Sequence, residues 1–179
     1  MLGDDKRISL NLNMFHHVLS ILYDVFPPDR LVVVSRSSAL LDVAHNGGSV
    51  AHRETTEGLN AALREGARIA VERGATQILT MSSDLPFLAP DDIRALLATE
   101  GDVVVATDRA RTGTNALLLR RPFGIDYRYG EASLSAHLAA AEDAGLAATV
   151  VDRPGLARDI DMPSDLGELD DFQARSRSR

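Results

Sequence analysis

An aspartate follows a strand-like run and stands in a stiff loop. The run Gln77–Met81 is mostly apolar or β-branched, and Asp84 comes soon after it, just before Leu85 and Pro86. Because a proline restricts the preceding residue to extended backbone, the loop that carries this carboxylate is nearly rigid. A metal ligand needs such a fixed position. The alternative is a turn aspartate that bonds nearby backbone amides.

A second acidic group lies near the end of the chain. Asp159 and Asp161 alternate with Ile160, so in extended backbone both carboxylates project from one face while the isoleucine points to the core. Two carboxylates on one face repel each other unless protons or a cation neutralise them. Mg²⁺ suits this group, because it binds one or two carboxylates and takes its other ligands from water and phosphate. The alternative is that Asp161 caps a helix entered at Pro163, with Asp159 in solvent.

Two glycine-containing segments have the composition of an anion site. They are Thr112–Ala116 and Tyr129–Ser133. Small hydroxyl and glycine residues let backbone amides approach an anion, and Ser133 at a helix start offers free N–H groups to a phosphate or carboxylate. Ordinary turn and N-cap chemistry is the alternative for either segment. His137, one helical turn beyond Ser133, is a weaker candidate, and no histidine has metal-binding spacing.

Helix-period and strand-period segments alternate along the chain and would position these groups. We expect helices over residues 4–23, 38–43, 58–73, 90–98, 133–144 and 163–173, and strands over 31–34, 49–51, 77–81, 102–106, 116–119 and 148–152. This alternation is typical of an α/β fold with a mainly parallel, Rossmann-like sheet between helix layers. Ligands then bind beyond the carboxyl ends of the strands. We expect one domain over residues 1–172 and a flexible basic tail over 173–179.

The overall charge limits the class of partner. A net charge of −7 argues against a broad footprint on a nucleic acid polymer or an anionic membrane. A small phosphorylated ligand remains compatible, because a bound divalent cation can reverse the local sign of an acidic pocket. The sequence has no cysteine, which excludes disulfides and thiolate metal sites and fits a cytoplasmic protein. An exposed sheet edge would allow a homo-oligomer.

Five short motifs, in their order along the chain, resemble one enzyme family. They are Gly58–Leu63, Asp84–Pro86, Gly113–Leu118, Tyr129-Gly130 with Ser133 and His137, and Asp159–Asp161 with Pro163, Asp165 and Leu166. Together they resemble the guanylyltransferases that activate 2-phospholactate or phosphoenolpyruvate on the route to coenzyme F-420. The resemblance implies a Rossmann-type nucleotidyltransferase fold, similar to nucleotide-diphospho-sugar transferases and to the enzymes that guanylylate molybdopterin.

The resemblance also implies a magnesium site and a mechanism. Asp84, Asp159 and Asp161 would hold Mg²⁺ and serve in catalysis. An acceptor phosphate oxygen would attack the α-phosphorus of GTP, and pyrophosphate would leave. Because two anions must meet, the protein would act mainly through charge neutralisation and alignment. No side-chain nucleophile is required.

Binding roles follow from the same resemblance. Thr114, Gly130 and Ser133 would hold the carboxylate and phosphate of a phosphorylated three-carbon acid. The residues expected near the nucleotide, GTP, are Gly58, Leu59 and Asn60. Four positions depart from the family's pattern in or beside these motifs. Arg111 and Ala132 stand where glycine is usual, Leu134 where phenylalanine is common, and Met162 where threonine is common.

The beginning of the chain leaves alternatives open. Family members open with a strand and a Pro-x-Lys loop that help bind GTP, and we expect both to be missing here. One alternative is therefore a truncated, non-catalytic module that binds a phosphorylated acid and a metal. Another is a guanylyltransferase for a different acceptor, such as 3-phosphoglycerate, molybdopterin or a sugar phosphate.

Overall fold

The computed structural model describes residues 4–158, with side chains from residue 9 onward. Its elements are α1 (Asp4–Tyr23), the 3₁₀ helix η1 (Pro28–Arg30), β1 (Val32–Ser35), α2 (Ser38–Asn46), β2 (Val50–Arg53), α3 (Leu59–Glu72), β3 (Gln77–Met81), α4 (Pro90–Ala98), β4 (Val103–Thr107), β5 (Thr114–Arg120), α5 (Ser133–Asp143) and β6 (Ala148–Val151). The expected elements up to residue 152 are thus confirmed, with bounds that differ by a few residues. The expected helix over 163–173 and the tail over 173–179 lie outside the described residues.

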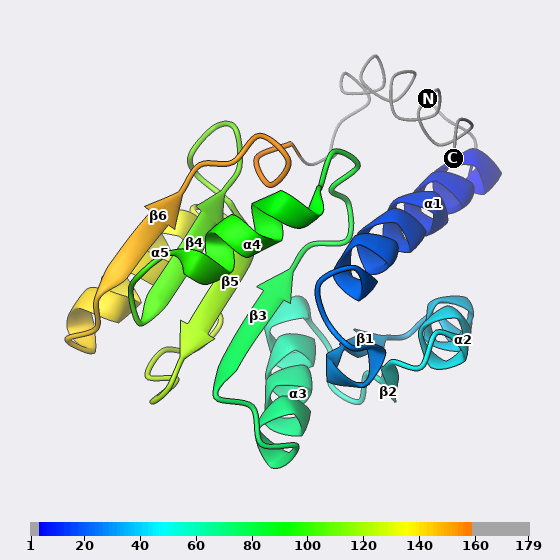
Figure 1. Ribbon diagram of the computed structural model, residues 1–179, viewed down its shortest axis with the longest axis horizontal. Coiled ribbons are helices and arrows are strands. Elements are labelled where there is room, and N and C mark those ends of the chain that lie inside the picture. Colours follow the sequence, from blue (N-terminus) through cyan, green and yellow to red (C-terminus); the bar gives the residue numbers. More distant parts are fainter. Residues whose placement is uncertain (1–3, 159–179) are drawn as a thin grey trace.

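The strands form two sheets (Figure 1). β1 and β2 pair in parallel, and a four-stranded sheet has the order β3-β5-β4-β6. β4 and β6 are parallel, whereas β5 is antiparallel to both β3 and β4. The α/β class is confirmed, but the larger sheet is mixed rather than mainly parallel. The reason is the link between β4 and β5, residues 108–113, which is shorter than the crossover of about a dozen residues that a parallel pair needs.

Helices cover both faces of the four-stranded sheet. Every residue of β4 is buried, and alternate side chains point to opposite faces. Val104 packs on one face with side chains of α1 and α4, including Ile21 and Ile93. Val105 packs on the other face with Leu134 of α5. The sheet therefore lies between helix layers, as the alternating pattern predicted.

Helix α1 lies against the loop that follows β3. Its buried side chains include Met14 and Val18, and His17 Nε2 lies 3.1 Å from the Leu88 carbonyl oxygen. α1 ends at Tyr23, shortly before Pro27 and Pro28, which cannot continue a helix. Among residues 4–158, no helix combines the length and apolar character needed to cross a membrane.

Helix α3 links the two sheets. It contacts both β1 and β3, and its Leu63 packs against the cluster that contains Val105. The approach to β1 is close, because a Cβ on Gly66 would lie 3.1 Å from Val34 Cγ2. In Figure 1 the cyan-green α3 lies between β3 and the β1–β2 pair. α3 therefore fixes the smaller sheet relative to the larger one.

The smaller sheet is less buried than its sequence suggests. The run Leu31–Val34 is apolar on both faces and is expected to be covered on both. All four residues of β1 are instead only partly buried. β1 pairs with β2 alone, and within the described part of the chain no hydrogen bonds join it to β3. This lack of a second neighbour explains the residual exposure.

Candidate active site

One edge of the four-stranded sheet collects most of the candidate residues. β3 and β4 end at this edge and antiparallel β5 begins there, because Met81 pairs with Ala116 and Thr107 with Thr114. β6, parallel to β4, ends at the same edge. The segments that carry Asp84 and Thr114 therefore meet at this edge with the chain that follows β6 and leads to Asp159, as the sequence predicted.

The Asp84 loop is rigid and presents a carboxylate oxygen that lacks a partner. Leu85 is 0% exposed, and the Leu88 amide donates to the Leu85 carbonyl at 3.2 Å. Asp84 Oδ1 is buried and accepts no hydrogen bond from the residues that the structure describes. A turn aspartate would accept bonds from neighbouring amides. A buried, unpartnered carboxylate oxygen is instead suited to a cation, because an unpaired buried charge is costly.

The segment that precedes Asp159 packs against this loop. Gly155 has no room for a side chain, because a Cβ there would lie 2.8 Å from the Phe87 carbonyl oxygen and in collision with the Asp92 carboxylate. Arg153 Nε donates to Asp92 Oδ1 at 3.0 Å. The Arg158 guanidinium carbon lies 5.6 Å from the centroid of the Phe87 ring. The chain is thus held beside the Asp84 loop up to residue 158.

The other two expected metal ligands lie outside the described residues. They are Asp159 and Asp161. Among the side chains that the structure describes, residues 9–158, no three acidic or histidine groups come together as a metal site. The observation that bears on a metal is therefore the Asp84 oxygen itself.

An aspartate missed by the sequence analysis shapes the loop between β4 and β5. Asp108 Oδ1 accepts from the Thr112 and Gly113 amides at 2.8 and 2.9 Å. Burial alone would raise the pKa of this carboxyl, but these bonds and those from the Thr107 and Thr112 hydroxyls outweigh it and lower the pKa. Asp108 therefore stays ionised and holds the loop in a fixed shape at the start of β5. An aspartate a few residues before a glycine is typical of a turn that the carboxylate organises, so this spacing could have predicted the role of Asp108.

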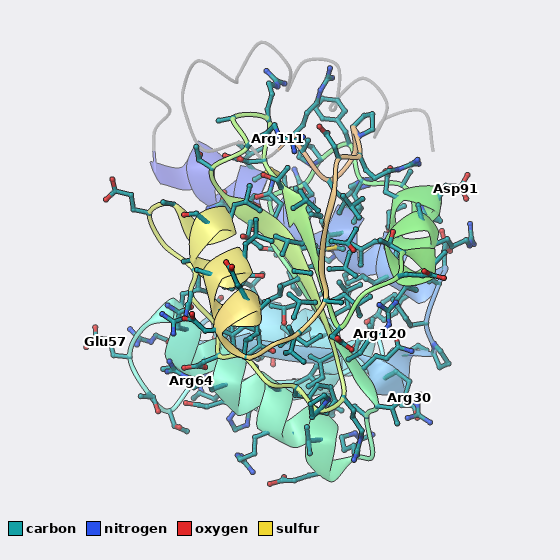
Figure 2. All side chains as sticks on the ribbon, turned by 90° about the vertical axis from the view of Figure 1, so that its left-hand side faces the viewer. Arg30, Glu57, Arg64, Asp91, Arg111 and Arg120 are labelled. Atoms are coloured by element: carbon teal, nitrogen blue, oxygen red, sulfur yellow. The ribbon has the colours of Figure 1, made fainter. Side chains whose placement is uncertain are left out.

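Arg111 lies at the tip of this loop in a left-handed conformation. Its φ is 58°, which explains why glycine would be favoured at this position. Its guanidinium donates to Asp152 Oδ2 at 2.9 Å. Figure 2 shows Arg111 at the end of the molecule where β5 begins, with Arg120 toward the opposite end.

Thr114 contacts a fully buried histidine. Thr114 Oγ1 lies 3.1 Å from His137 Nδ1, and His137 Nε2 accepts from the Arg128 backbone amide at 3.0 Å. Burial is the main cause that lowers the pKa of His137 to about 4, and the charge of Arg128 adds to it. A hydrogen bond with the Ser133 backbone acts in the opposite direction. The imidazole is therefore neutral at physiological pH. These contacts extend the weaker sequence prediction for His137.

The segment before α5 leaves backbone accessible. Gly130 has a φ of +138° and no atom within 4 Å of the place of a Cβ, so its backbone conformation rather than crowding requires glycine. Ala132, the N-cap of α5, is left-handed with φ 53° and ψ 35°. Ser133 begins the helix and is 2% exposed. The Leu134 amide already donates to the Thr112 carbonyl at 3.0 Å, which ties this segment to the Asp108 loop.

The expected nucleotide segment lies next to the expected acceptor segment. Gly58 is the N-cap of α3 with a φ of 104°, and Leu59 is 61% exposed. The Asn60 side chain donates to the Tyr129 carbonyl at 2.9 Å and accepts from the Tyr129 amide at 2.8 Å. Both ends of the Asn60 amide are therefore occupied by backbone. No spacing rule predicts this contact, because the two residues are 69 positions apart.

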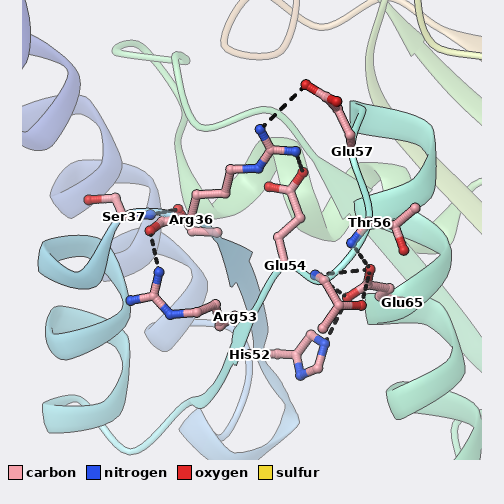
Figure 3. A network of polar contacts seen from close by, with 10 residues as sticks. Arg36, Ser37, His52, Arg53, Glu54, Thr56, Glu57 and Glu65 are labelled. Atoms are coloured by element: carbon pink, nitrogen blue, oxygen red, sulfur yellow. Dashed lines mark hydrogen bonds and ion pairs between the residues drawn. The ribbon is translucent and has the colours of Figure 1, made fainter.

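A carboxylate network holds the loop between β2 and α3 (Figure 3). Glu65 accepts from the Thr55 amide and hydroxyl, from the Thr56 amide, and from His52 Nε2 at 2.8 Å. The Thr55 hydroxyl is the leading cause that lowers the pKa of Glu65 to about 2, against the effect of burial. Arg36 adds an ion pair with Glu54 at 3.1 Å. The loop that leads to Gly58 is thus anchored.

Comparison with known proteins agrees with this geometry. The family described as "Guanylyl transferase CofC like" matches residues 1–172. A phosphoenolpyruvate guanylyltransferase from Rubrobacter xylanophilus is 41% identical over 92% of this chain and 81% of its own length. One from Sphaerobacter thermophilus is 38% identical over 94% and 82%. A 3-phospho-D-glycerate guanylyltransferase from Colwellia psychrerythraea is 33% identical over 92% and 80%.

A crystal structure supports the same fold. A protein described as a nucleotide-diphospho-sugar transferase, from Desulfovibrio desulfuricans, superposes with a TM-score of 0.70 at 19% identity. The superposition covers 94% of this chain and 76% of that chain. The family match, the relatives and the shared fold agree with one another. This chain belongs to the CofC-like guanylyl transferase family of nucleotidyltransferases.

Proposed function

We propose that this protein transfers GMP from GTP to the phosphate of phosphoenolpyruvate or 2-phospholactate, a step in coenzyme F-420 formation. An acceptor phosphate oxygen forms a bond to the α-phosphorus of GTP. The bond from that phosphorus to the bridging oxygen breaks, and pyrophosphate leaves with its electron pair. The family match and the relatives named for this chemistry support the proposal.

The observation that carries the proposal is the buried, unpartnered oxygen of Asp84. A carboxylate oxygen without a partner, at the edge where β3 ends and β5 begins, suits Mg²⁺. Asp84 would hold the ion, with Asp159 and Asp161 as its expected companions. When bound, Mg²⁺ offsets negative charge on the transferring phosphoryl group. The rigid loop around Asp84 aligns the site before substrates arrive, which favours a direct displacement.

The acceptor is assigned to the start of β5 and the start of α5. Thr114 and Ser133 supply hydroxyl groups, and the open backbone at Gly130 supplies room for close approach of an anion. The helix start adds N–H groups that favour negative charge. A small acid that carries both a carboxylate and a phosphate suits this site, because the hydroxyl and N–H donors lie on two separate elements.

The nucleotide is assigned to the start of α3. Exposed Leu59 offers an apolar surface to a base, and Gly58 allows close backbone approach. Asn60 serves a different role, because its amide is occupied by Tyr129. It would set the distance between the GTP segment and the acceptor segment.

A panel of acceptors tests the proposal. Purified protein is incubated with GTP, Mg²⁺ and either phosphoenolpyruvate, 2-phospholactate or 3-phosphoglycerate, and pyrophosphate release is followed. We expect release with one of the first two acids and none without Mg²⁺. If the protein prefers 3-phosphoglycerate, the acid in the name of the Colwellia relative, the proposed acceptor is wrong and the proposed transfer of GMP still holds. Binding of an acid without any GTP binding would indicate a non-catalytic module and contradict the proposal.

A further inference from the structure

His137 is a buried polar side chain that cannot reach a ligand itself. It is 0% exposed, whereas its neighbour Thr114 retains 6%. The imidazole lies between the Thr114 hydroxyl, the Arg128 backbone amide and the ring of Tyr129. The two ring centroids are 5.1 Å apart at an interplanar angle of 74°. A side chain enclosed in this way affects a substrate only through a neighbour.

The backbone contact assigns the proton of the imidazole. The Arg128 N–H can only donate, so His137 Nε2 accepts. A neutral imidazole then carries its single proton on Nδ1, which faces Thr114 Oγ1 at 3.1 Å. Because Nδ1 bears a hydrogen, it cannot accept one from the hydroxyl. The Nδ1 hydrogen is shared between the Ser133 backbone and the Thr114 oxygen. The hydrogen of the Thr114 hydroxyl is therefore directed to another acceptor. Among the described residues, none takes that hydrogen.

We propose that His137 is a positioning residue, which fixes the Thr114 hydroxyl as a hydrogen-bond donor to an oxyanion of the acceptor. The identity of that acceptor as a phosphorylated acid rests on the proposed function. An oxyanion suits this donor, because hydrogen bonds to ionised acceptors are roughly twice as strong as those between neutral groups. The neutral state of His137 preserves the assignment at physiological pH, since only one ring nitrogen then carries a hydrogen.

The surrounding contacts keep this donor in place. Tyr129 packs against the imidazole, and its backbone is held on both sides by Asn60. Thr114 belongs to the buried start of β5, so its backbone is fixed by the sheet. The donor direction is thus set before the acceptor binds, and preorganisation of this kind increases affinity.

Two substitutions of His137 separate its two hydrogen bonds. A glutamine places its amide near Nε2 and keeps the contact with Arg128, whereas an asparagine places its amide near Nδ1 and keeps donation to Thr114. We expect His137→Gln to raise the KM for the acid about 10-fold. His137→Asn should raise it less than about 3-fold, and the KM for GTP should change in neither. Thermal unfolding of both variants provides the check on folding.

A double-mutant cycle tests whether His137 acts through Thr114. Thr114→Val removes the hydroxyl at nearly constant volume, and Thr114→Ser keeps it. If the proposal holds, Thr114→Val raises the KM for the acid about 10-fold, Thr114→Ser retains most of the affinity, and adding His137→Gln to Thr114→Val changes little more. Additive effects of the two substitutions, or an unchanged KM for the acid in Thr114→Val, would overturn the proposal.

The assay distinguishes this inference from the proposed function. Transfer by the wild-type protein with normal acid kinetics in Thr114→Val would reject the role of His137 and leave the function intact. If the wild-type protein transfers no GMP, calorimetric titration of the same variants with phosphoenolpyruvate decides the matter. Weaker binding in Thr114→Val and His137→Gln supports the positioning role, and unchanged binding refutes it.

Discussion

The start of β5 and the loop between β2 and α3 both border the candidate site, but different forces hold them. At β5, Thr114 and Asn115 are buried, and their side chains bond to His137 and to the Leu156 carbonyl. The β2–α3 loop depends on a carboxylate network around Glu65. Buried neutral bonds are insensitive to salt, whereas exposed ionic contacts are screened.

We propose that the two regions have separate tasks. The rigid start of β5 suits a small acid whose few atoms must be placed accurately. The β2–α3 loop lies beside the segment assigned to the larger GTP. Substitutions in the first region should therefore change stability and acid binding, and those in the second should change GTP binding.

The largest effect on stability is expected from the core beneath the first region. Leu117 of β5 is 0% exposed, so Leu117→Ala should lower the free energy of unfolding by about 3 to 4 kcal/mol. Val33→Ala in the half-buried β1 should cost only about 1 kcal/mol. Urea unfolding measures both variants. Equal losses would show that the two sheets do not differ as described.

The pH dependence of stability should separate the same two regions. The pKa of His137 is lowered from 6.5 to about 4, so between these values the unfolded chain binds a proton that the folded protein does not. The free energy of unfolding should fall as pH drops through this window, by up to about 3 kcal/mol. The pKa of Glu65 is lowered from 4.5 to about 2, so its contribution is lost only below pH 4.5. His137→Gln should remove the pH dependence of the free energy of unfolding between about pH 4 and 6.5, and leave the change below pH 4.5 that comes from Glu65.

A kinetic effect is expected from the β2–α3 loop. Glu65→Gln weakens the bonds to Thr55 and Thr56, so the KM for GTP should rise about 3- to 10-fold while the KM for the acid stays constant. Glu72→Gln is a matched control, because Glu72 lies on the same helix and pairs only with Arg68 among the described residues. A change in acid KM alone would contradict the assignment of this loop to GTP.

The smallest effect concerns the left-handed residue before α5. Ala132 has a φ of 53°, a conformation that costs a residue with a Cβ roughly 1 to 2 kcal/mol. Ala132→Gly should therefore stabilise the protein by about 1 kcal/mol. Ala139→Gly, in the interior of the same helix, should destabilise it by a similar amount. Thermal unfolding of the two variants tests the prediction.

Much of the fold was readable from the sequence, because local patterns determine helices and strands. The strand at 77–81 and the helix at 90–98 have the predicted bounds. The strand expected at 116–119 begins at Thr114. Thr114 and Asn115 are residue types common in turns, but buried hydrogen-bond partners allow both to lie inside the strand. The antiparallel direction of β5 was missed, although the short link before it was a usable signal.

The site was readable in part for the same reason. Motifs predicted where Asp84, Thr114 and Ser133 lie in the fold, since each follows or begins a recognisable element, and their roles in binding stay predictions. The contact between Asn60 and Tyr129 and the network of Glu65 depend on chain segments that meet only after folding. Asp159 and Asp161 lie outside the described residues and stay predictions.

The central claim is that Asp84 holds the cation that the transfer requires. Pyrophosphate release should be measured for Asp84→Asn and for Asp91→Asn, the same chemical change at an exposed carboxylate that projects from α4 (Figure 2). We expect a loss of at least about 100-fold for Asp84→Asn and near wild-type rates for Asp91→Asn. Wild-type activity in a folded Asp84→Asn protein would contradict the account.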